Sequence, residues 1–418
     1  MITVIPGHRG RHLFEGIRDP RIRAFEALTD SSPNLIVFPC GQDRRFDRSR
    51  TIRIPDDIQR GISQGRIGLV FDASTEGVMH KPDISDALHM TLDHLRGVPE
   101  QCVYVTQDRN YRSDYATHCT RTGRARQVHV LNHDYWIWDA LSHFADTGDD
   151  EYRRRLQTFR ARPAQRARKF VSLNRTPRPM KVLFLLRVIS DGLWNSGFIS
   201  FGGFRSTADG PGKAQPSEEE MVRALPGFED LIHSVMPEMK TLAGVGRSLL
   251  GMEQHGWDRL ELWNASRAVD LEEYANSWFT AVTETEMRSR PSRITEKLIK
   301  PLANFQPFVV FANPGALRMV RDYGFFTFEN IVDESYDDEP DPRRRFDLAY
   351  AEFARLCAQS EQEWSRMEKE IEDRLTFNAH WGLTRLPTEV RRRQDCSLVD
   401  EIVRAVGLTN LTTHIRTQ

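Results

Sequence analysis

The chain has 418 residues, of which 39% are hydrophobic, 10% are aromatic and 28% are charged, and its formal net charge at pH 7 is −1. This composition is typical of a globular protein with a sizeable core, and the near-zero charge excludes a globally basic nucleic-acid binder. A chain of this length favours two domains of ordinary size.

Cysteine usage and hydrophobic runs indicate the compartment. The five cysteines are widely spaced and form no Cys-x-x-Cys pair, which argues against a disulfide framework and a structural zinc site. No hydrophobic run approaches the roughly twenty residues that span a bilayer, and residues 1–6 lack the length and basic flank of a signal peptide. We therefore expect a cytoplasmic protein, and peripheral attachment to a membrane through a basic surface stays open.

The first part of the chain alternates short β-branched runs with helical patterns, which predicts a parallel sheet in a first Rossmann-like domain over residues 1–150. Its clearest helix is predicted over residues 84–95. The strands are predicted over residues 2–5, 34–38, 67–71, 102–106 and 128–131.

Polar residues that follow these strands are candidates for a general base. Ligands of open α/β sheets bind beyond the carboxyl ends of the strands. Asp72 and Glu76 lie in an acidic, Gly-containing loop after the third strand, and His133 follows the fifth. Each can take the proton of an acceptor hydroxyl. In the structural alternative, Asp72 caps the next helix, Glu76 is solvated and His133 only supports the fold.

Residues 151–168 predict a basic helical connection between two domains. Residues 135–168 are helical in pattern, and eight of the seventeen residues 153–169 are Lys or Arg. Such a segment can contact a polyanion such as DNA, or an anionic lipid surface. The alternative is an exposed helix whose apolar residues pack inward.

Residues 169–345 predict a second Rossmann-like domain. Asn174, Arg175 and Arg178 follow its first strand. An asparagine there can hydrogen-bond a ribose or a sugar, and arginines can bind a diphosphate in a bidentate manner. The alternative for the arginines is an exposed position at a helix start. The strands are predicted over residues 170–173, 197–201, 278–282 and 308–311, and a helix over 178–190.

The most informative segment reads Arg-Ile-Thr-Glu-Lys-Leu-Ile-Lys-Pro from Arg293, with the loop Asn313-Pro-Gly further on. Thr295 is a candidate cap of a short helix, whose free backbone N–H groups attract anions. Lys297 and Lys300 lie three positions apart on one helix face and can together neutralise a diphosphate. The alternative is a solvated helix face.

This segment resembles the donor-sugar motif of bacterial fucosyltransferases and related two-domain glycosyltransferases. The shared features are Glu286 nine positions before Thr295, the Thr-Glu-Lys of residues 295–297, and the Pro-Phe-Val-Val of residues 307–310. Fucosyltransferases carry Phe-Glu-Asn in place of the Glu-Thr-Glu-Met of residues 284–287, and an aromatic residue in place of Arg293. These departures favour a glycosyltransferase whose donor sugar stays open.

The resemblance implies the GT-B architecture of two Rossmann-like domains, and the transfer of a sugar from a nucleotide-diphosphate sugar to a hydroxyl acceptor. Arg175 would hold the donor phosphates, and Glu284 or Glu286 would accept hydrogen bonds from ribose or sugar hydroxyls. Glu296 belongs to the Thr-Glu-Lys motif, and Asn313 follows the next strand. We expect inversion without a metal or other cofactor, and a glycan or a modified nucleic acid as acceptor. A non-catalytic nucleotide- or nucleic-acid-binding protein is the alternative.

The last part of the chain adds an acidic string and a helical extension. Residues 333–341 hold six acids, but they lie beside prolines and before three arginines, which predicts a charged surface loop rather than a metal site. Residues 346–418 predict a helical C-terminal extension, because apolar residues such as Phe353 and Trp364 recur at helical spacing.

Overall fold

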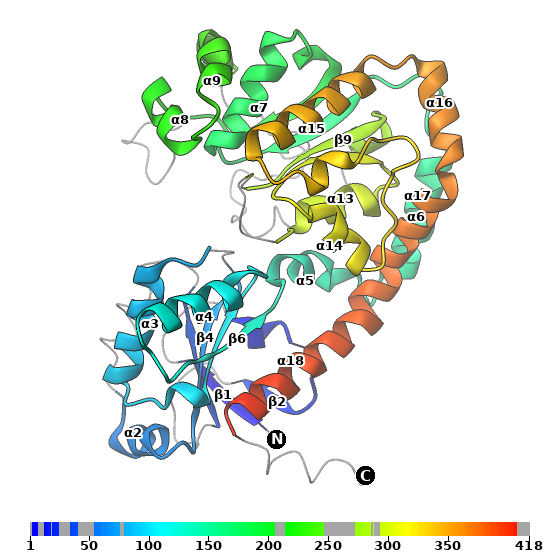
Figure 1. Cartoon of the computed structure of the whole chain (residues 1–418). Coiled ribbons are helices and arrows are strands. Elements are labelled where there is room, and N and C mark those ends of the chain that lie inside the picture. The colour runs from blue at the N-terminus through cyan, green and yellow to red at the C-terminus, as the bar shows by residue number, and fades with distance from the viewer. Residues whose placement is uncertain are drawn as a thin grey trace. The chain divides into compact units, whose positions relative to one another are not determined.

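The computed structural model describes residues 2–6, 12–17, 19–24, 34–40, 54–75, 79–204, 214–245, 272–285, 287 and 293–407. The chain divides into two compact units (Figure 1). Unit 1 consists of Met1–Ser142, Pro291–Arg293 and Pro387–Gln418, and unit 2 consists of His143–Arg290 and Ile294–Leu386. The C-terminal segment therefore belongs to the same unit as the N-terminal segment.

Unit 1 is built on a six-stranded sheet in the order β2-β1-β3-β4-β5-β6, and all of its strand pairs are parallel. The inner strands β3, β4 and β5 are buried along their whole length, as expected of a parallel sheet that is covered on both faces. The strands are β1 (Ile2–Pro6), β2 (Ile22–Ala24), β3 (Leu35–Pro39), β4 (Gly68–Ala73), β5 (Cys102–Thr106) and β6 (His129–Asn132).

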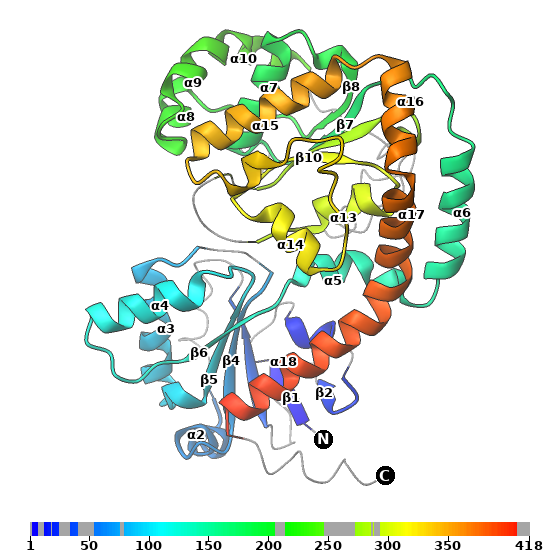
Figure 2. The same ribbon diagram turned by 45° about the vertical axis from the view of Figure 1, so that its right-hand side comes forward.

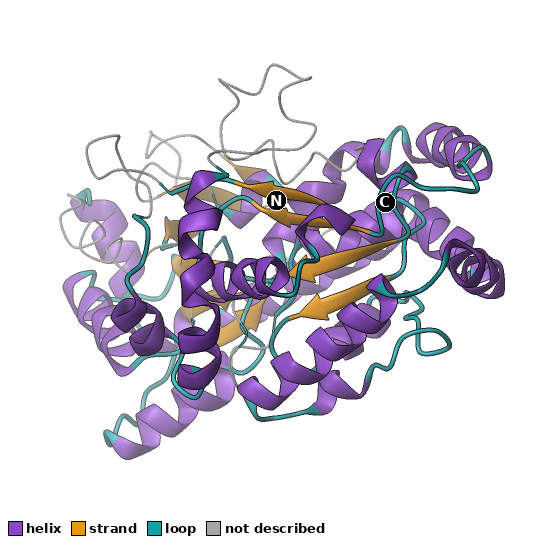
Figure 3. Cartoon of the chain, turned by 90° about the horizontal axis from the view of Figure 1, so that it is seen from above, coloured by secondary structure: helices purple, strands orange, loops and turns teal. Residues whose placement is uncertain are grey.

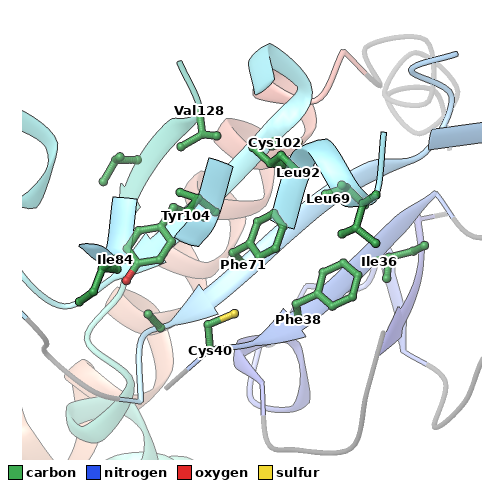
Figure 4. Packing of buried hydrophobic residues seen from close by; sticks show 14 of the residues in the cluster. Ile36, Phe38, Cys40, Leu69, Phe71, Ile84, Leu92, Cys102, Tyr104 and Val128 are labelled. Atoms are coloured by element: carbon green, nitrogen blue, oxygen red, sulfur yellow. The ribbon is translucent and has the colours of Figure 1, made fainter. Parts of the chain in front are cut away.

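One face of this sheet packs against α2, α3 and α4 through a cluster that includes Ile36, Phe38, Phe71 and Tyr104 (Figure 4). Phe38 stacks on Phe71 with ring centroids 5.3 Å apart. The helices of unit 1 are η1 (Leu13–Glu15), α2 (Asp56–Ser63), α3 (Pro82–His94), η2 (Pro99–Gln101), α4 (Tyr111–Arg121), α5 (Tyr135–Leu141) and α18 (Arg391–Ala405).

The opposite face packs against α18, the last described helix of the chain (Figure 1). Strand residues alternate between the two faces, so Val37, Val70 and Val103 lie on this side. They form one buried cluster with residues of α18 such as Val399 and Ile402. The core of unit 1 therefore includes a helix that is separated from the last strand of the sheet by more than half of the sequence.

Unit 2 is built on a four-stranded parallel sheet in the order β10-β9-β7-β8. The chain passes from β7 to β8 on one side of β7 and then to β9 on the other side, so the order of the strands reverses between β7 and β9. The strands are β7 (Phe170–Asn174), β8 (Gly197–Phe201), β9 (Phe279–Thr283) and β10 (Phe308–Phe311).

Helix α15 lies across this sheet, and its Phe353 is the centre of an aromatic core (Figure 2). The ring centroid of Phe353 lies 4.8 Å from Phe170, 5.4 Å from Phe184 and 5.9 Å from Phe279. The helices of unit 2 are α6 (Gly148–Arg160), α7 (Pro179–Ser190), η4 (Trp194–Ser196), α8 (Glu218–Ala224), α9 (Glu229–Val235), η6 (Met236–Glu238), α10 (Met239–Gly244), α12 (Glu272–Ala275), α13 (Glu296–Ala303), α14 (Ala316–Asp322), η7 (Ser335–Asp338), α15 (Pro342–Cys357), α16 (Glu361–Glu370) and α17 (Glu372–His380).

The predicted α/β fold class is confirmed. Parallel strands are surrounded by helices, which Figure 3 shows by colour. The last part of the chain is helical up to residue 407, as the sequence predicted. Two further helices, η3 (Ser142–Ala145) and the π-helix η8 (Trp381–Val390), contain boundaries between the units. Among the described residues, no helix is both long enough and apolar enough to cross a membrane.

The prediction that the basic segment 153–169 contacts DNA is not supported. Arg162 and Arg166 both bind the carboxylate of Glu368, with nitrogen–oxygen distances of 3.4 and 2.6 Å. The guanidinium of Arg166 also lies 3.8 Å from the ring centroid of Trp278. Six of the eight basic side chains of the segment therefore form ion pairs within unit 2. The other ion pairs are Arg153–Asp150, Arg154–Glu151, Arg155–Glu151 and Lys169–Glu361.

Candidate functional site

The candidate site lies at the carboxyl ends of β7 and β9, where the strand order of the unit 2 sheet reverses. In open parallel sheets this is the usual place for a ligand. The two strand ends are tied together by side chains: the Oγ1 of Thr283 donates a 2.6 Å hydrogen bond to the Oδ1 of Asn174. The Nδ2 of Asn174 donates to the Oγ of Ser172 at 2.9 Å. Asn174 is fully buried. Its amide therefore holds the edge of the sheet together, and its binding to a ribose or a sugar stays a prediction.

Glu284 follows β9 and anchors the start of α13. Its buried carboxylate accepts hydrogen bonds from the backbone N–H of Thr295 at 3.0 Å and from the Oγ1 of Thr295 at 2.8 Å. Thr295 is the N-cap of α13, as the sequence predicted, because its Oγ1 accepts a bond from the backbone N–H of Lys297. The end of β9 and the start of α13 are therefore linked by these hydrogen bonds.

Lys297 and Lys300 come from the same helix but have different surroundings. The side chain of Lys297 is 22% exposed, and its Nζ lies 3.5 Å from a carboxylate oxygen of Glu284 and 3.5 Å from one of Glu296. Lys300 is buried, and this burial lowers its pKa to about 8. Burial opposes the ionisation of Glu296, but the charges of the neighbouring lysines outweigh it and hold its pKa below the usual value.

Arg175 and Arg178 follow β7 and are both half-buried. Arg178 is the N-cap residue of α7. A Cβ atom on Gly202, which follows β8, would lie only 1.7 Å from the backbone oxygen of Arg175. The backbone at Gly202 therefore closely approaches the loop that carries Arg175. The charge of Arg175 acts on Lys300, which places the two residues in one electrostatic group.

Lys181 is a functional candidate that the sequence reasoning missed. It lies in the first turn of α7 and is only 4% exposed. Burial and the charges of Lys297 and Arg178 lower the pKa of Lys181, whereas the charges of Glu284 and Glu296 raise it, and the net pKa is about 7. The available signal was a single lysine in the otherwise apolar first turn of a helix that follows a strand.

Together these side chains form a cationic cluster, which we define as Arg175, Arg178, Lys181, Lys297 and Lys300. Two carboxylates, Glu284 and Glu296, share the cluster, which leaves an excess of three positive charges when every group is ionised. An anion with two or three negative charges, such as a diphosphate, neutralises this excess.

Two predicted donor ligands have less defined surroundings. Asn313 is buried after β10, beside Gly315, which adopts the left-handed conformation that favours glycine with φ 78°. Glu286 lies outside the described residues.

Two acids of the string 333–341 stabilise helix starts. The carboxylate of Asp337 accepts hydrogen bonds from the backbone N–H groups of Leu317 and Arg318, at 3.0 and 3.2 Å, and so stabilises the start of α14. Asp341 caps α15 by accepting a bond from the backbone N–H of Arg344. Asp337 is buried rather than on a surface loop, because its bonds hold it beneath α14. Within the described ranges, no group of acids, histidines and cysteines is arranged to hold a metal ion.

The candidate bases belong to unit 1. The carboxylate of Asp72 is 1% exposed and accepts bonds from the backbone N–H of Leu13 at 2.6 Å and from the Ser74 hydroxyl at 2.6 Å. Burial raises the pKa of Asp72. His133 follows β6, and burial, with the charges of Arg391 and Arg109, lowers its pKa to about 3. These surroundings favour structural roles for Asp72 and His133. Glu76 lies outside the described part of the chain.

No protein-family model matches the chain, and no curated protein matches it. Solved structures with some likeness are trehalose-6-phosphate synthases. One, from Burkholderia multivorans, has a TM-score of 0.40 at 13% identity, over 92% of this chain and 73% of that one. A second, studied for glycosyltransfer with retention, has a TM-score of 0.38 at 13% identity over 83% and 71%. A third, a UDP-forming synthase from Burkholderia vietnamiensis, has a TM-score of 0.35 at 14% identity over 86% and 80%.

Proposed function

We propose that the protein is a glycosyltransferase that moves a sugar from a nucleotide-diphosphate sugar to a hydroxyl acceptor. The observation that carries the proposal is the cationic cluster at the carboxyl ends of β7 and β9. Its arginines follow one strand of unit 2, and two of its lysines come from a helix whose start is fixed by Glu284 and Thr295. Two of its members, Lys181 and Lys300, are buried, and the positive charge of the cluster as a whole favours an anionic ligand.

The donor would place its diphosphate against the cationic cluster. Lys297 lies in the first turn of α13, a helix of eight residues, and its side chain is partly exposed, so its ammonium group would bind phosphate oxygens. Departure of the sugar leaves negative charge on the nucleoside diphosphate, and fixed cations around that position stabilise it. Glu286 and Asn313 remain proposed ligands of the ribose or the sugar.

Three finer points belong to the same proposal. The reaction needs no metal, because the lysines and arginines supply the positive charge that a divalent cation otherwise provides. It inverts the anomeric configuration, as the resemblance to fucosyltransferases implies. The acceptor carries a hydroxyl group, and a glycan is the favoured class because the basic segment 153–169 is internally paired.

A panel of nucleoside diphosphates tests the first step. Isothermal titration calorimetry with UDP, GDP, CDP and ADP should reveal one that binds, and the matching nucleotide sugars should release it when acceptors are added. A folded protein that binds none of the four would contradict the proposal. Turnover that survives EDTA supports the metal-independent reaction, and turnover that is lost and then returns with Mg²⁺ or Mn²⁺ contradicts it. NMR of the product's anomeric proton decides between inversion and retention.

A non-catalytic nucleotide-binding protein is the second candidate. It is favoured by the surroundings of two candidate bases: the carboxylate of Asp72 is engaged in hydrogen bonds within unit 1, and His133 is buried with a strongly lowered pKa. This candidate would be favoured if the protein bound a nucleoside diphosphate tightly but released none from any nucleotide sugar. Even slow hydrolysis of the nucleotide sugar, without an acceptor, should then be absent.

A further inference from the structure

Lys181 is a buried lysine that makes no direct ion pair among the described residues. It is 4% exposed, and within the described part of the chain it has neither a hydrogen bond nor an ion pair. Buried lysines are rare, and most are paired. Its position in the first turn of α7, a helix of twelve residues, adds the positive end of a helix dipole to the same region. Burial and the helix dipole therefore both disfavour an ammonium ion at this position in the empty site.

The charged groups that act on Lys181 come from several elements. Arg178, at the start of its own helix, and Lys297, on α13, repel a proton on it, whereas Glu296 on α13 and Glu284 after β9 attract one. Helices α9 and α10 also pack against α7, but none of their charged groups is among those that act on Lys181. With burial included, the pKa of Lys181 falls to about 7.

A bound diphosphate changes this balance. It adds two to three negative charges to a cluster that has an excess of positive charge, and opposite charges nearby favour the protonated form of a lysine. We propose that Lys181 is a proton-accepting residue of the diphosphate site, uncharged when the site is empty and protonated when a nucleoside diphosphate is bound. The inference rests on the proposed function, since it needs that ligand in that site. The proton comes from the buffer, and no bond of the ligand breaks.

Binding is then linked to the uptake of a proton. Because the lysine must gain a proton that it lacks above pH 7, the affinity for a diphosphate is greatest below pH 7 and falls as the pH rises. One linked proton weakens binding by up to about tenfold for each pH unit above that value. Lys300, with a pKa of about 8, adds to the effect at higher pH.

Calorimetry of the full chain at pH 8 tests the inference. UDP, GDP and inorganic pyrophosphate are titrated in two buffers of different ionisation enthalpy, and the difference in heat gives the number of protons taken up. At pH 8 the terminal phosphates of UDP and GDP have already lost their protons, whereas pyrophosphate still carries one. The difference between the wild type and a variant with the same ligand therefore reports on the protein. The wild type should take up about one proton more than Lys181→Met, since a lysine with a pKa of about 7 is mostly uncharged at pH 8.

Two further variants separate charge from structure. Lys181→Arg carries a permanent charge, so it should keep the affinity for the diphosphate and lose the extra proton uptake. Lys240→Met removes an exposed lysine of the same unit and should behave like the wild type. Binding with equal uptake by the wild type and Lys181→Met would overturn the inference and leave the proposed function intact. Binding of a ligand by the wild type without any proton uptake would also overturn the inference and leave the proposed function intact. Absence of binding for all three ligands would overturn the proposed function and the inference together.

Discussion

Thr295 shows how a single hydroxyl sets the geometry of the candidate site. Its Oγ1 donates to the carboxylate of Glu284 and accepts from the backbone N–H of Lys297, so it serves as a helix cap and as a tie to the strand end. Its backbone N–H is bound to the same carboxylate at 3.0 Å. The Thr-Glu-Lys motif therefore provides Lys297 and, through Thr295, also determines its position.

Lys297→Ala should weaken the binding of a nucleoside diphosphate by about 1.5–3 kcal/mol, the range for a lost charge-assisted hydrogen bond. The Nζ of Lys297 lies 3.5 Å from Glu284 and 3.5 Å from Glu296, so its loss also removes a positive charge beside two carboxylates and makes the site more negative. Calorimetry with the best-binding nucleotide measures the change. Lys369→Ala, an exposed lysine of the same unit, is the matched control. Unchanged affinity in folded Lys297→Ala would remove Lys297 from the proposed site.

Gly202→Ala should disturb the site without touching any charged group. The added Cβ would lie 1.7 Å from the backbone oxygen of Arg175, and backbone cannot move aside as a side chain can, so the loop that carries Arg175 must shift. We expect a loss of nucleotide affinity of about tenfold or more, together with lower stability. Gly244→Ala is the control, because a Cβ there meets nothing within 4 Å. If both alanine variants bind alike, the close approach at Gly202 has no part in positioning Arg175.

Sequence reasoning located most of these residues but not their individual roles. A residue that follows a buried strand must lie at the edge of the sheet, which is why Arg175 and Glu284 could be placed in advance. Thr295 could be placed because its position before a helical run is typical of a helix cap. The partner of each side chain could not be predicted: Asp72 is bound by the N–H of Leu13, which lies 59 residues earlier. Such a contact depends on the folded structure, and no local pattern encodes it.

At the scale of elements, the strands were predictable because buried parallel strands are continuous β-branched and aromatic runs. The runs at 102–106, 197–201 and 308–311 coincide with β5, β8 and β10. The strand β2 was missed, because three residues at the edge of a sheet leave too short a pattern. The helical extension predicted over residues 346–418 is interrupted before Glu361, where Ser360 caps α16. Its Ser-x-x-Glu spacing was a readable signal.

Helix α18 should contribute strongly to the stability of unit 1. Ile402→Ala removes a side chain that is 1% exposed in the cluster formed by this helix and the sheet, and the expected cost is about 2–5 kcal/mol. Urea denaturation followed by circular dichroism measures it. Arg404→Ala, an exposed position on the same helix, should change stability by less than about 0.5 kcal/mol. Equal stability of the two variants would mean that α18 does not pack on the sheet in solution.

At the scale of the whole molecule, the chain leaves unit 1 after Ser142 and returns to it at Pro387. The return lies within the π-helix η8, which connects α17 to α18 and contains Pro387. Helical periodicity predicted helices in this region. It does not indicate which sheet each helix covers, because the apolar face of α17 or of α18 could pack against either unit. The assignment of α18 to the first sheet required the structure.

Acid should destabilise the protein before its carboxylates are protonated, through buried histidines of unit 1. Burial lowers the pKa of His133 to about 3 and that of His12 to about 4, whereas a histidine in the unfolded chain has a pKa near 6.5. Below pH 6.5 the unfolded chain therefore binds protons that the folded chain does not. Each such histidine lowers the free energy of unfolding by about 1.4 kcal/mol per pH unit, until the pH reaches the pKa of the folded state.

His133→Gln should flatten this dependence, because glutamine has no titrating group. Between pH 7 and pH 5 the free energy of unfolding of the variant should fall less steeply than that of the wild type, by about 1.4 kcal/mol per pH unit below pH 6.5. Urea denaturation at several pH values gives the slopes, which stay informative even if the variant is less stable at every pH. His94→Gln, an exposed histidine in the last turn of α3, is the control and should keep the wild-type slope. Parallel curves for the wild type and His133→Gln would show that His133 is protonated in the folded protein, and that the carboxyl end of β6 is open to water.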